Sequence, residues 1–313
     1  MGYDLLTAAG HLNGLIFSLI IFFSGYWLQK STRSSIISIC GSIAVLASIP
    51  LTYVSKFVWS EPLFILLLLL FMICLDNYIC GLSSRFLIGG ASFAALAFLT
   101  RYIGVTIVIT GCILLLIRKR KLINRLVETF IFGFISSFPI ALWMARNYLL
   151  LNTLTGGRPP AGNTFTENIG ITFKRLASWF APGYSESAFY LMLALAILIS
   201  VIAVMRNWLI REDSGIQGDI HGTRSKKGIQ GVQGVKSEQD IQEAQEAQGV
   251  NMAYRIAIPL VFSFVYVAYL VVSASVVAFD SINDRLLVPV FVPLAMASFF
   301  TLHSFMALQK GKT

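Results

Sequence analysis

Long apolar runs alternate with short polar segments along the chain, a pattern typical of membrane-spanning helices rather than of the amphipathic helices of a soluble domain. A helix needs about 20 mostly apolar residues to cross the hydrocarbon core of a bilayer. Nine runs in the sequence approach this length: 11–29, 35–54, 61–79, 85–100, 102–118, 127–146, 188–206, 255–275 and 285–306. We therefore expect an all-α, polytopic membrane protein with about nine transmembrane helices.

The polar segment 212–250 differs from the other connections. It is rich in Gln and Gly, repeats the motif GIQG, and has too few bulky apolar residues to form a core. We expect a disordered cytosolic insertion, with a short helix over Ser237–Gln248 as an alternative for its last part. A tolerated low-complexity loop explains this composition better than a docking site. The rest of 1–306 is predicted to form one transmembrane domain, followed by a cytosolic tail at 307–313.

The composition supports a bilayer as the main partner of the chain. Hydrophobic residues make up 56% of the sequence, charged residues only 12%, and the mean hydropathy is +0.75. A net charge of +9 would suggest nucleic acid as the ligand of a soluble protein. In a membrane protein the same charge more simply reflects loop Lys and Arg residues, so we expect no nucleic-acid partner.

The placement of Lys and Arg residues predicts the orientation of the chain. If the basic loop Arg118–Lys121 is cytosolic, most of the loop Lys and Arg residues lie inside, as the positive-inside rule requires. The N-terminus is then outside and the C-terminus is cytosolic. The outer side holds Lys56, Arg101, Arg146, Arg158, Lys174, Arg175 and Arg285. No basic region precedes the first run and no Asn-x-Ser/Thr acceptor occurs, which favours a bacterial inner membrane without a cleaved signal peptide.

The Cys and His residues do not form a metal motif. All four cysteines lie in or beside apolar runs, which indicates buried small side chains rather than metal ligands. The sequence therefore predicts no metal site and leaves any cofactor unknown.

No predicted span has an acidic residue, a lysine or an arginine near its middle, and a group of charged residues lies at the outer ends of the spans. An ion-coupled transporter usually has charged groups near the midplane, so a transporter is the least favoured class. The residues at the outer ends are Glu61, Arg101, Arg146, Asp280, Asp284 and Arg285. A single arginine can extend to the headgroups, and an acid at a helix start is favoured by the helix dipole. The three arginines among these residues are harder to explain one by one, because the positive-inside rule disfavours arginine on the outer side. Together they suit the binding of a phosphate.

The predicted outer loop 147–187 contains a rigid Gly-Gly-Arg-Pro-Pro turn and the stretch "FKRLASWFAPGY". Aromatic side chains beside Lys174 and Arg175 favour a helix at the membrane interface. A simple anchor explains the aromatic residues, but an extracytosolic loop here would also cover a lipid headgroup.

Four stretches together resemble a known family. "WSEPLFILLLLL", "FLTRYIGVTIVITGCILLL", "PIALWMARNYLLLNTLTGGRPP" with "WFAP" downstream, and "NDRLLVPVFVPL" occur in this order. This order is similar to that of GT-C glycosyltransferases, the membrane superfamily of protein O-mannosyltransferases (glycosyltransferase family 39) and Rgt-like bacterial relatives. The resemblance implies transfer of a sugar from a polyprenyl-phosphate donor to a lipid, glycan or protein acceptor on the outer face.

The same resemblance implies roles for individual residues. The donor phosphate would be bound by Arg101, Arg285 and Arg146. The surrounding cavity would be lined by Tyr102, Asn147 and Asp280, together with Glu61. Because the departing lipid phosphate is an anion, guanidinium groups would stabilise the charge that develops on it. We thus expect Glu61 and the three arginines around one outward-opening cavity.

The chain departs from the family pattern at its start. The family has one more N-terminal span and a first outer loop with an acidic base, whereas this chain starts at "MGYDLLTAAG", which resembles the stretch after that loop. We therefore expect that span and loop to be missing, as in a truncated, split or degenerate gene. The catalytic base is then unknown, with Glu61, Asp284 and Asp4 as candidates. The alternative is a non-catalytic polyprenyl-phosphate-binding protein or partner subunit.

Overall fold

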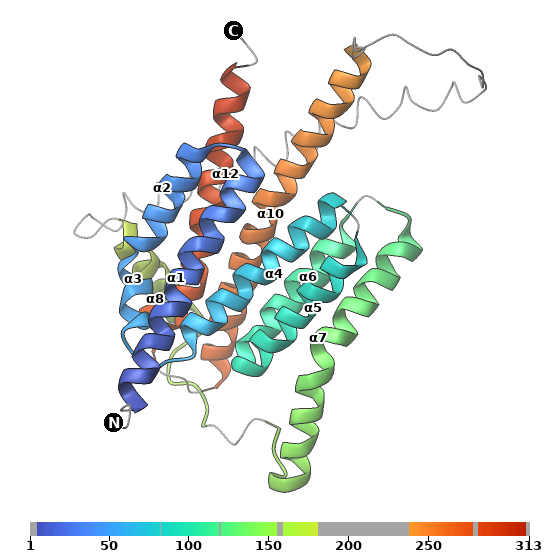
Figure 1. Ribbon diagram of the computed structural model, residues 1–313. Coiled ribbons are helices and arrows are strands. Elements are labelled where there is room, and N and C mark those ends of the chain that lie inside the picture. Colours follow the sequence, from blue (N-terminus) through green and yellow to red (C-terminus); the bar gives the residue numbers. More distant parts are fainter. Residues whose placement is uncertain are drawn as a thin grey trace.

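The computed structural model describes residues 5–81, 83–118, 120–154, 159–180, 238–277 and 281–310. In these residues the fold is all-helical, without a β-strand (Figure 1). Five helical segments are long and apolar enough to cross a membrane: Thr7–Thr32, Glu61–Gly81, Leu122–Leu151, Asn251–Val276 and Asp284–Ala307. The chain is therefore an integral membrane protein.

A broken helix provides a further candidate span. Helix α1 (Leu5–Thr32) is followed by α2 (Ser35–Leu46) and α3 (Ile49–Ser55), and the last two meet at an angle of 56°. The Ser48 side chain caps α3 by accepting a hydrogen bond from the Leu51 amide at 3.3 Å. Pro50 has no amide hydrogen to donate, so it fits the first turn of a new helix and not the continuation of α2.

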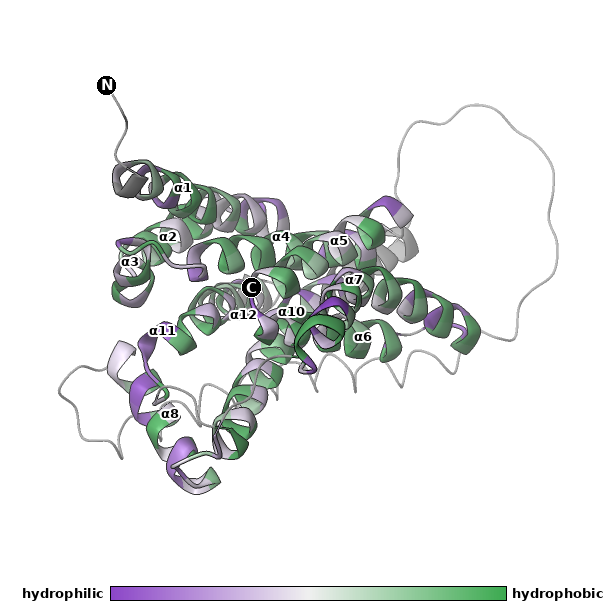
Figure 2. Cartoon of the chain, turned by 90° about the horizontal axis from the view of Figure 1, so that it is seen from below, coloured by the Kyte–Doolittle hydropathy of each residue, from purple (hydrophilic) through white to green (hydrophobic). Residues whose placement is uncertain are grey.

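Helix α4 (Glu61–Gly81) is the most buried of the five long segments. It packs against α1, α5 (Ser84–Thr100), α10 (Glu238–Val276) and α12 (Phe291–Lys310), as Figure 2 shows along the bundle. A continuous apolar sequence such as that of α4 suits a helix that has protein on all sides. The start of α4 therefore lies in the protein interior and not at the lipid-facing perimeter.

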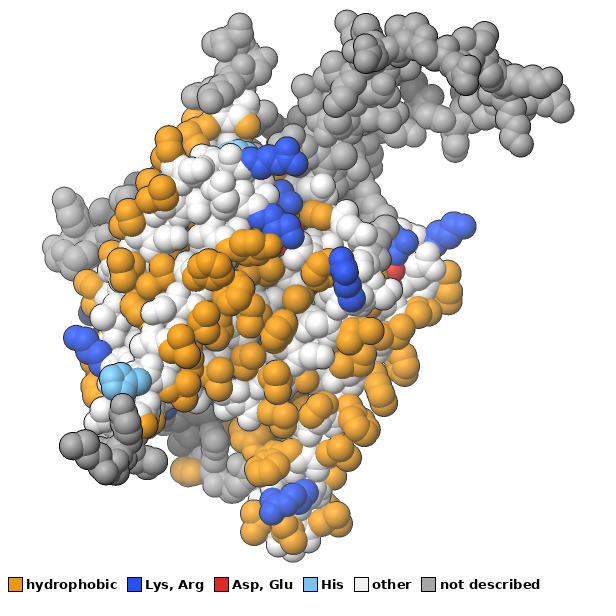
Figure 3. Space-filling view, in the orientation of Figure 1, with side chains coloured by type: hydrophobic (Ala, Val, Ile, Leu, Met, Phe, Trp, Pro, Cys, Tyr) orange, Lys and Arg blue, Asp and Glu red, His pale blue; other side chains and the backbone are white. Residues whose placement is uncertain are grey.

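Helix α7 (Leu122–Leu151) is the most exposed of the five, although it is rich in Leu, Ile and Phe. Apolar side chains cover much of the face shown in Figure 3, and most of the Lys and Arg side chains on this face lie in its upper half. This distribution is what a bilayer requires, because its core solvates apolar side chains and not charges.

Each predicted span among the described residues coincides with helix. The runs 11–29, 61–79, 127–146, 255–275 and 285–306 fall within the five long segments, and 35–54 corresponds to the bent pair. The runs 85–100 and 102–118 form the shorter apolar helices α5 and, after the 3-10 turn η1 (Tyr102–Gly104), α6 (Val105–Leu116). The run 188–206 lies outside the described residues. Among the described residues, five segments have the length and composition of a span, or six if the bent pair counts as one.

The predicted insertion is described only in its last part. Residues 238–250 form the first turns of α10, continuous with the membrane segment, because Glu, Gln and Ala are good helix formers. Residues 212–237 and 311–313 lie outside the described residues.

The bundle has two ends, which we name after the charged residues that lie there. At the Glu61 end, the lower end in Figure 1, α4 begins, α5 and α7 end, and α11 (Asp284–Leu287) begins. At the opposite Arg255 end, Arg255 Nε lies 3.1 Å from Asp76 Oδ1, and Trp27 Nε1 donates a hydrogen bond to Asp76 Oδ2 at 2.9 Å. These contacts join α1, α4 and α10.

Candidate functional site

The turn between α5 and α6 positions Arg101. Helix α5 ends at Thr100, Arg101 is extended, and the Gly104 amide donates a hydrogen bond to the Arg101 carbonyl at 2.8 Å. A Cβ at position 104 would lie 2.5 Å from the Cα of Phe98, closer than real Cβ atoms approach. Glycine is therefore required for this close approach of η1 to α5, which orients Arg101 at the Glu61 end.

Arg285 is positioned by the short helix α11. The Asn283 side chain caps α11 by accepting a hydrogen bond from the Leu286 amide at 3.1 Å. The fully buried Tyr266 donates its hydroxyl hydrogen to the Leu286 carbonyl at 2.8 Å. The Tyr266 bond attaches α11 to α10, and the two bonds together fix the backbone on both sides of Arg285.

The two arginines meet at one carboxylate, Glu61, the first residue of α4. Arg101 Nη1 lies 2.7 Å from Glu61 Oε1, and Arg285 Nε lies 2.5 Å from the same oxygen. The Glu61 side chain is 0% exposed, whereas those of Arg101 and Arg285 are 15% and 38% exposed. A carboxylate is also favoured here because it lies at the positive end of the α4 dipole. We call these three residues the Glu61 cluster.

The Glu61 cluster has an excess of positive charge. Two guanidinium groups, which stay protonated in proteins, face one carboxylate. Arg101 Nη1 lacks the alignment of a hydrogen bond despite its short distance, so its contact with Glu61 is an ion pair only. Because Arg285 is partly exposed, the cluster offers donor groups to an anion that approaches from the Glu61 end.

An aromatic side chain of the α3–α4 connection, Trp59, packs against Arg285. The guanidinium carbon of Arg285 lies 4.4 Å from the centre of the Trp59 ring. Trp59 in turn stacks on Phe57 at 4.5 Å between ring centres and meets Tyr53 edge-on at 5.9 Å. The contact of Trp59 with Arg285 was not predicted from the sequence. The position of Trp59, two residues before the acid that starts a span, is a signal that could have indicated it.

Arg146 is not part of the Glu61 cluster. It is exposed on α7, and its guanidinium carbon lies 5.3 Å from the ring centre of Trp143. Trp143 Nε1 donates a weak hydrogen bond to the Tyr102 hydroxyl at 3.4 Å. Arg146 is thus connected to Tyr102 only through Trp143, and the neighbouring Asn147 is half-buried on the same helix.

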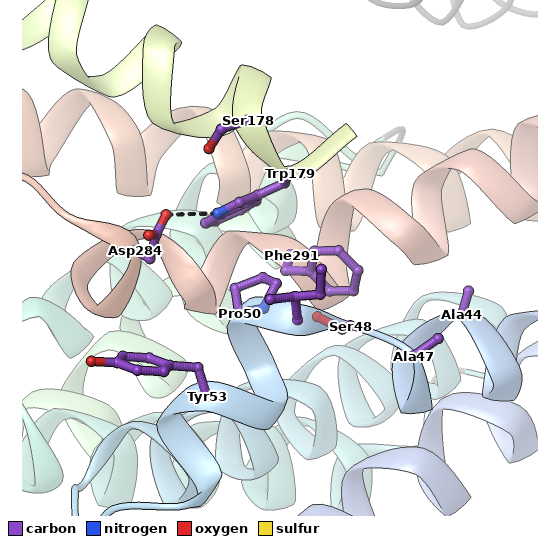
Figure 4. A pocket seen from close by; sticks show the side chains of 10 residues that line it. Ala44, Ala47, Ser48, Pro50, Tyr53, Ser178, Trp179, Asp284 and Phe291 are labelled. Carbon is purple, nitrogen blue, oxygen red and sulfur yellow. Dashed lines mark hydrogen bonds between the residues drawn. The ribbon is translucent and has the colours of Figure 1, made fainter. Parts of the chain in front are cut away.

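A cavity of about 420 Å³ lies beside α11, at the bend between α2 and α3 (Figure 4). Trp179, on α8 (Phe165–Phe180), donates a hydrogen bond from Nε1 to Asp284 Oδ1 at 2.8 Å in this cavity. The lining residues are Ala44, Ala47, Ser48, Ile49, Pro50, Tyr53, Ser178, Trp179, Asp284 and Phe291. Among described residues the lining thus includes Asp284 but neither Glu61 nor the three arginines, so the expected arrangement around one cavity is replaced by two adjacent sites.

Helix α8 is held at its start by further hydrogen bonds, in addition to the Trp179–Asp284 bond near its end. At its start, the Glu167 carboxylate accepts a hydrogen bond from the Thr164 amide at 2.7 Å, and the Asn168 amide group donates to the Ser275 hydroxyl of α10 at 3.0 Å. The bonds from Thr164 lower the pKa of the Glu167 carboxyl below its ordinary value. The predicted interfacial stretch falls in the second half of α8, and its residues 181–184 lie outside the described residues.

Asp4 and Asp280, candidate base and candidate lining residue, lie outside the described residues, as does Arg158. Within the described part of the chain, no group of three or more His, Cys, Asp or Glu residues could hold a metal ion.

The chain matches no protein-family model, no curated protein and no solved structure. Any proposal for the function therefore depends on the geometry of the Glu61 cluster and the adjacent cavity, together with the sequence.

Proposed function

We propose that the protein is an integral-membrane glycosyltransferase of the GT-C type. It takes a sugar from a polyprenyl-phosphate donor and transfers it to a hydroxyl of a lipid, glycan or protein. The observation that carries this proposal is the convergence of Arg101 and Arg285 on the buried Glu61. A buried carboxylate that fixes two guanidinium groups, one of them partly exposed, gives a preorganised site for a phosphate.

The reaction class follows from the charge that develops on the leaving group. When the bond between the sugar and the phosphate oxygen breaks, negative charge accumulates on the departing polyprenyl phosphate. Donor groups that are already oriented stabilise this charge without reorganisation. The order of the four sequence stretches that resemble GT-C enzymes supplies the identity of the donor.

The proposal includes a topology with nine spans. Segment 188–206 supplies the span that the described helices lack, and α5 and α6 each cross as short helices. The Glu61 end faces outwards from a bacterial inner membrane, with the N-terminus outside and the C-terminus in the cytosol. The distribution of loop Lys and Arg residues supports this orientation.

Asp284 is the described carboxylate best placed to act as a base. It is partly exposed in a cavity, whereas the single buried Glu61 carboxylate already faces two arginines. A base must reach the hydroxyl of the acceptor, which a fully buried group does not. Asp4 is the other candidate that the sequence supplies.

A non-catalytic protein that binds polyprenyl phosphate is the second candidate. The burial of Glu61 favours it, because the cluster then resembles an anion-binding site without a base of its own. In this case the chain would present the lipid to a partner enzyme.

The decisive experiment compares wild type with Arg285→Ala in membranes supplied with radiolabelled polyprenyl-phosphate sugars. Loss of one preorganised donor group typically reduces turnover by about 10²–10³-fold. We expect a loss of this order in Arg285→Ala and wild-type turnover in Lys56→Ala, which removes an exposed cation at the same end.

Three outcomes distinguish the candidates. Turnover that depends on Arg285 supports the enzyme. Donor binding that depends on Arg285 without turnover supports the binding protein. Equal donor binding by wild type and Arg285→Ala would contradict both, because the Glu61 cluster would then have no role in phosphate recognition.

A further inference from the structure

The cavity beside α11 has the chemistry of a site for a polyhydroxylated group. Its volume of about 420 Å³ lies within the range of small-molecule sites, about 300–1,000 Å³. Trp179, Tyr53 and Phe291 give it aromatic walls, and Asp284 gives it one carboxylate (Figure 4). Aromatic faces pack against the C–H face of a sugar ring, and a carboxylate accepts strong hydrogen bonds from its hydroxyl groups.

The contact with Trp179 orients the Asp284 carboxylate for such a ligand. Nε1 of Trp179 occupies one lone pair of Oδ1 at 2.8 Å and thereby fixes the carboxylate. A carboxylate has about four acceptor positions, so among the described residues the Trp179 bond leaves most of them available. Trp179 also meets Phe291 edge-on at 6.1 Å between ring centres, which holds the indole in the cavity wall.

The cavity and the Glu61 cluster are adjacent. Asp284 lines the cavity, and the next residue, Arg285, belongs to the cluster. Tyr53 of the cavity contacts Trp59, and Trp59 lies 4.4 Å from the Arg285 guanidinium carbon. In a lipid-linked sugar, one oxygen joins the phosphate to the sugar ring. The two groups therefore need neighbouring sites, a cationic one for the phosphate and one with aromatic and hydrogen-bond-accepting groups for the sugar.

We propose that this cavity binds the sugar of the lipid-linked donor, while Arg285 and Arg101 bind its phosphate. The inference rests on the proposed function, because it assigns a second part of the same donor. It predicts that sugar and phosphate contribute separately to binding, through residues that can be changed independently.

The test measures equilibrium binding to the purified protein in lipid nanodiscs. The ligands are polyprenyl phosphate without a sugar and a panel of polyprenyl-phosphate hexoses and pentoses. Two variants alter the cavity and leave the three residues of the Glu61 cluster in place: Asp284→Asn removes the charge and keeps the size of the side chain, and Ala47→Phe fills the cavity from an exposed position. The readout is binding and not turnover, because Asp284 is also the candidate base. Arg285→Ala alters the cluster, and thermal unfolding of each variant checks that it is folded.

We expect at least one glycosylated lipid to bind wild type about ten-fold more tightly than the bare lipid, as a hydrogen bond to a charged group allows. Both cavity variants should abolish this advantage and leave the affinity for the bare lipid unchanged. Arg285→Ala should weaken the binding of both lipids.

The two hypotheses fail in different ways. If wild type does not bind the bare lipid, the proposed function is wrong. If it binds the bare lipid but no sugar of the panel adds affinity, or if the advantage persists in both cavity variants, the assignment of the cavity is wrong and the phosphate site stands.

Discussion

Glu61 shows how a single buried carboxylate can organise a site at the edge of a membrane domain. Its side chain is fully buried, and both of its arginine partners come from other helical segments, at the end of α5 and in α11. A charge in this position is stable only because its partners compensate the loss of hydration. The same contacts hold two guanidinium groups close together, which would otherwise repel each other.

Removal of the Glu61 charge should therefore destabilise the protein strongly. Glu61→Gln keeps the size of the side chain but leaves Arg101 and Arg285 without a counter-charge. Breaking a buried pair on one side costs about 3–5 kcal/mol, and the partial exposure of Arg285 places our expectation near the lower limit. The measurement is the thermal unfolding midpoint in detergent at neutral pH, which should fall clearly below that of wild type.

A double-mutant cycle provides the control for this prediction. Glu61→Gln combined with Arg101→Gln should cost less than the sum of the two single changes, because each change removes the same ion pair. The exposed Glu167→Gln at the same end should have little effect at neutral pH. Strictly additive effects would show that Glu61 and Arg101 do not stabilise each other.

At the residue scale, the sequence predicted the members of the Glu61 cluster better than those of the cavity. Glu61, Arg101 and Arg285 stand out as charges beside apolar runs, so hydropathy alone selects them. Trp179 and Asp284 are separated by 105 positions, and an interfacial tryptophan has a simple explanation as an anchor. Only the fold brings these two side chains within 2.8 Å of each other.

At the scale of the element, α8 is stabilised at its start by reciprocal hydrogen bonds. Besides accepting from the Thr164 amide, Glu167 donates its own amide hydrogen to the Thr164 hydroxyl oxygen at 3.4 Å, which makes a capping box. These bonds favour the ionised form, so the pKa of Glu167 lies below its ordinary value of 4.5. A group with a lowered pKa contributes stability above its ordinary pKa and loses it as the pH falls through the lowered value.

We therefore predict that the start of α8 loosens in acid. Hydrogen-exchange protection of the amides of residues 165–168 should be constant from neutral pH down to about 4.5, the ordinary value for Glu. Below this pH it should fall as the Glu167 carboxylate is protonated. Mass spectrometry of the peptide that contains α8, corrected for the intrinsic exchange rate, measures this protection.

Glu167→Gln is the matched variant, because glutamine forms the same capping box without a titratable group. Its protection should not change over the pH range in which that of wild type falls. If both proteins lost protection together, the change would arise from other groups and not from the capping box.

The elements differ from the sequence prediction where local chemistry interrupts an apolar run. Segment 35–54 reads as one span by hydropathy, yet the Ser48 cap and Pro50 bend it by 56°. Pro50 is a sequence signal for such a bend. The sequence does not indicate that the bend forms one wall of the cavity. Hydropathy reports how long an apolar run is and contains no information on the direction of the chain.

At the scale of the whole molecule, buried ion pairs lie at both ends of the bundle. Glu61 with its two arginines joins α4, α11 and the end of α5, whereas Asp76 and Arg255 join α4 and α10 at the other end. Helix α4 contributes the carboxylate at both ends, and the residues between are apolar. This arrangement fixes the height of α4 relative to its neighbours, because a shift of α4 along its axis would separate both sets of charges.

The two ends also differ in their basic residues, and this difference predicts which end faces the cytosol. The described residues of the Arg255 end include Lys30, Arg33, Arg85, Arg118, Arg120, Lys121 and Arg125. At the Glu61 end, two of the basic residues are already paired with Glu61. From the positive-inside rule we predict that the Arg255 end is cytosolic and the Glu61 end is outside.

Cysteine labelling in intact bacteria tests this orientation. All four native cysteines are free, so they are first replaced by Ala to give a parent without reactive thiols. Lys56→Cys then reports on the Glu61 end and Ser35→Cys on the Arg255 end, since both positions are exposed. A membrane-impermeant maleimide should label Lys56→Cys in intact cells and Ser35→Cys only after lysis. The reverse result would place the Glu61 cluster in the cytosol, where the donor phosphate would have to be recognised at the inner leaflet.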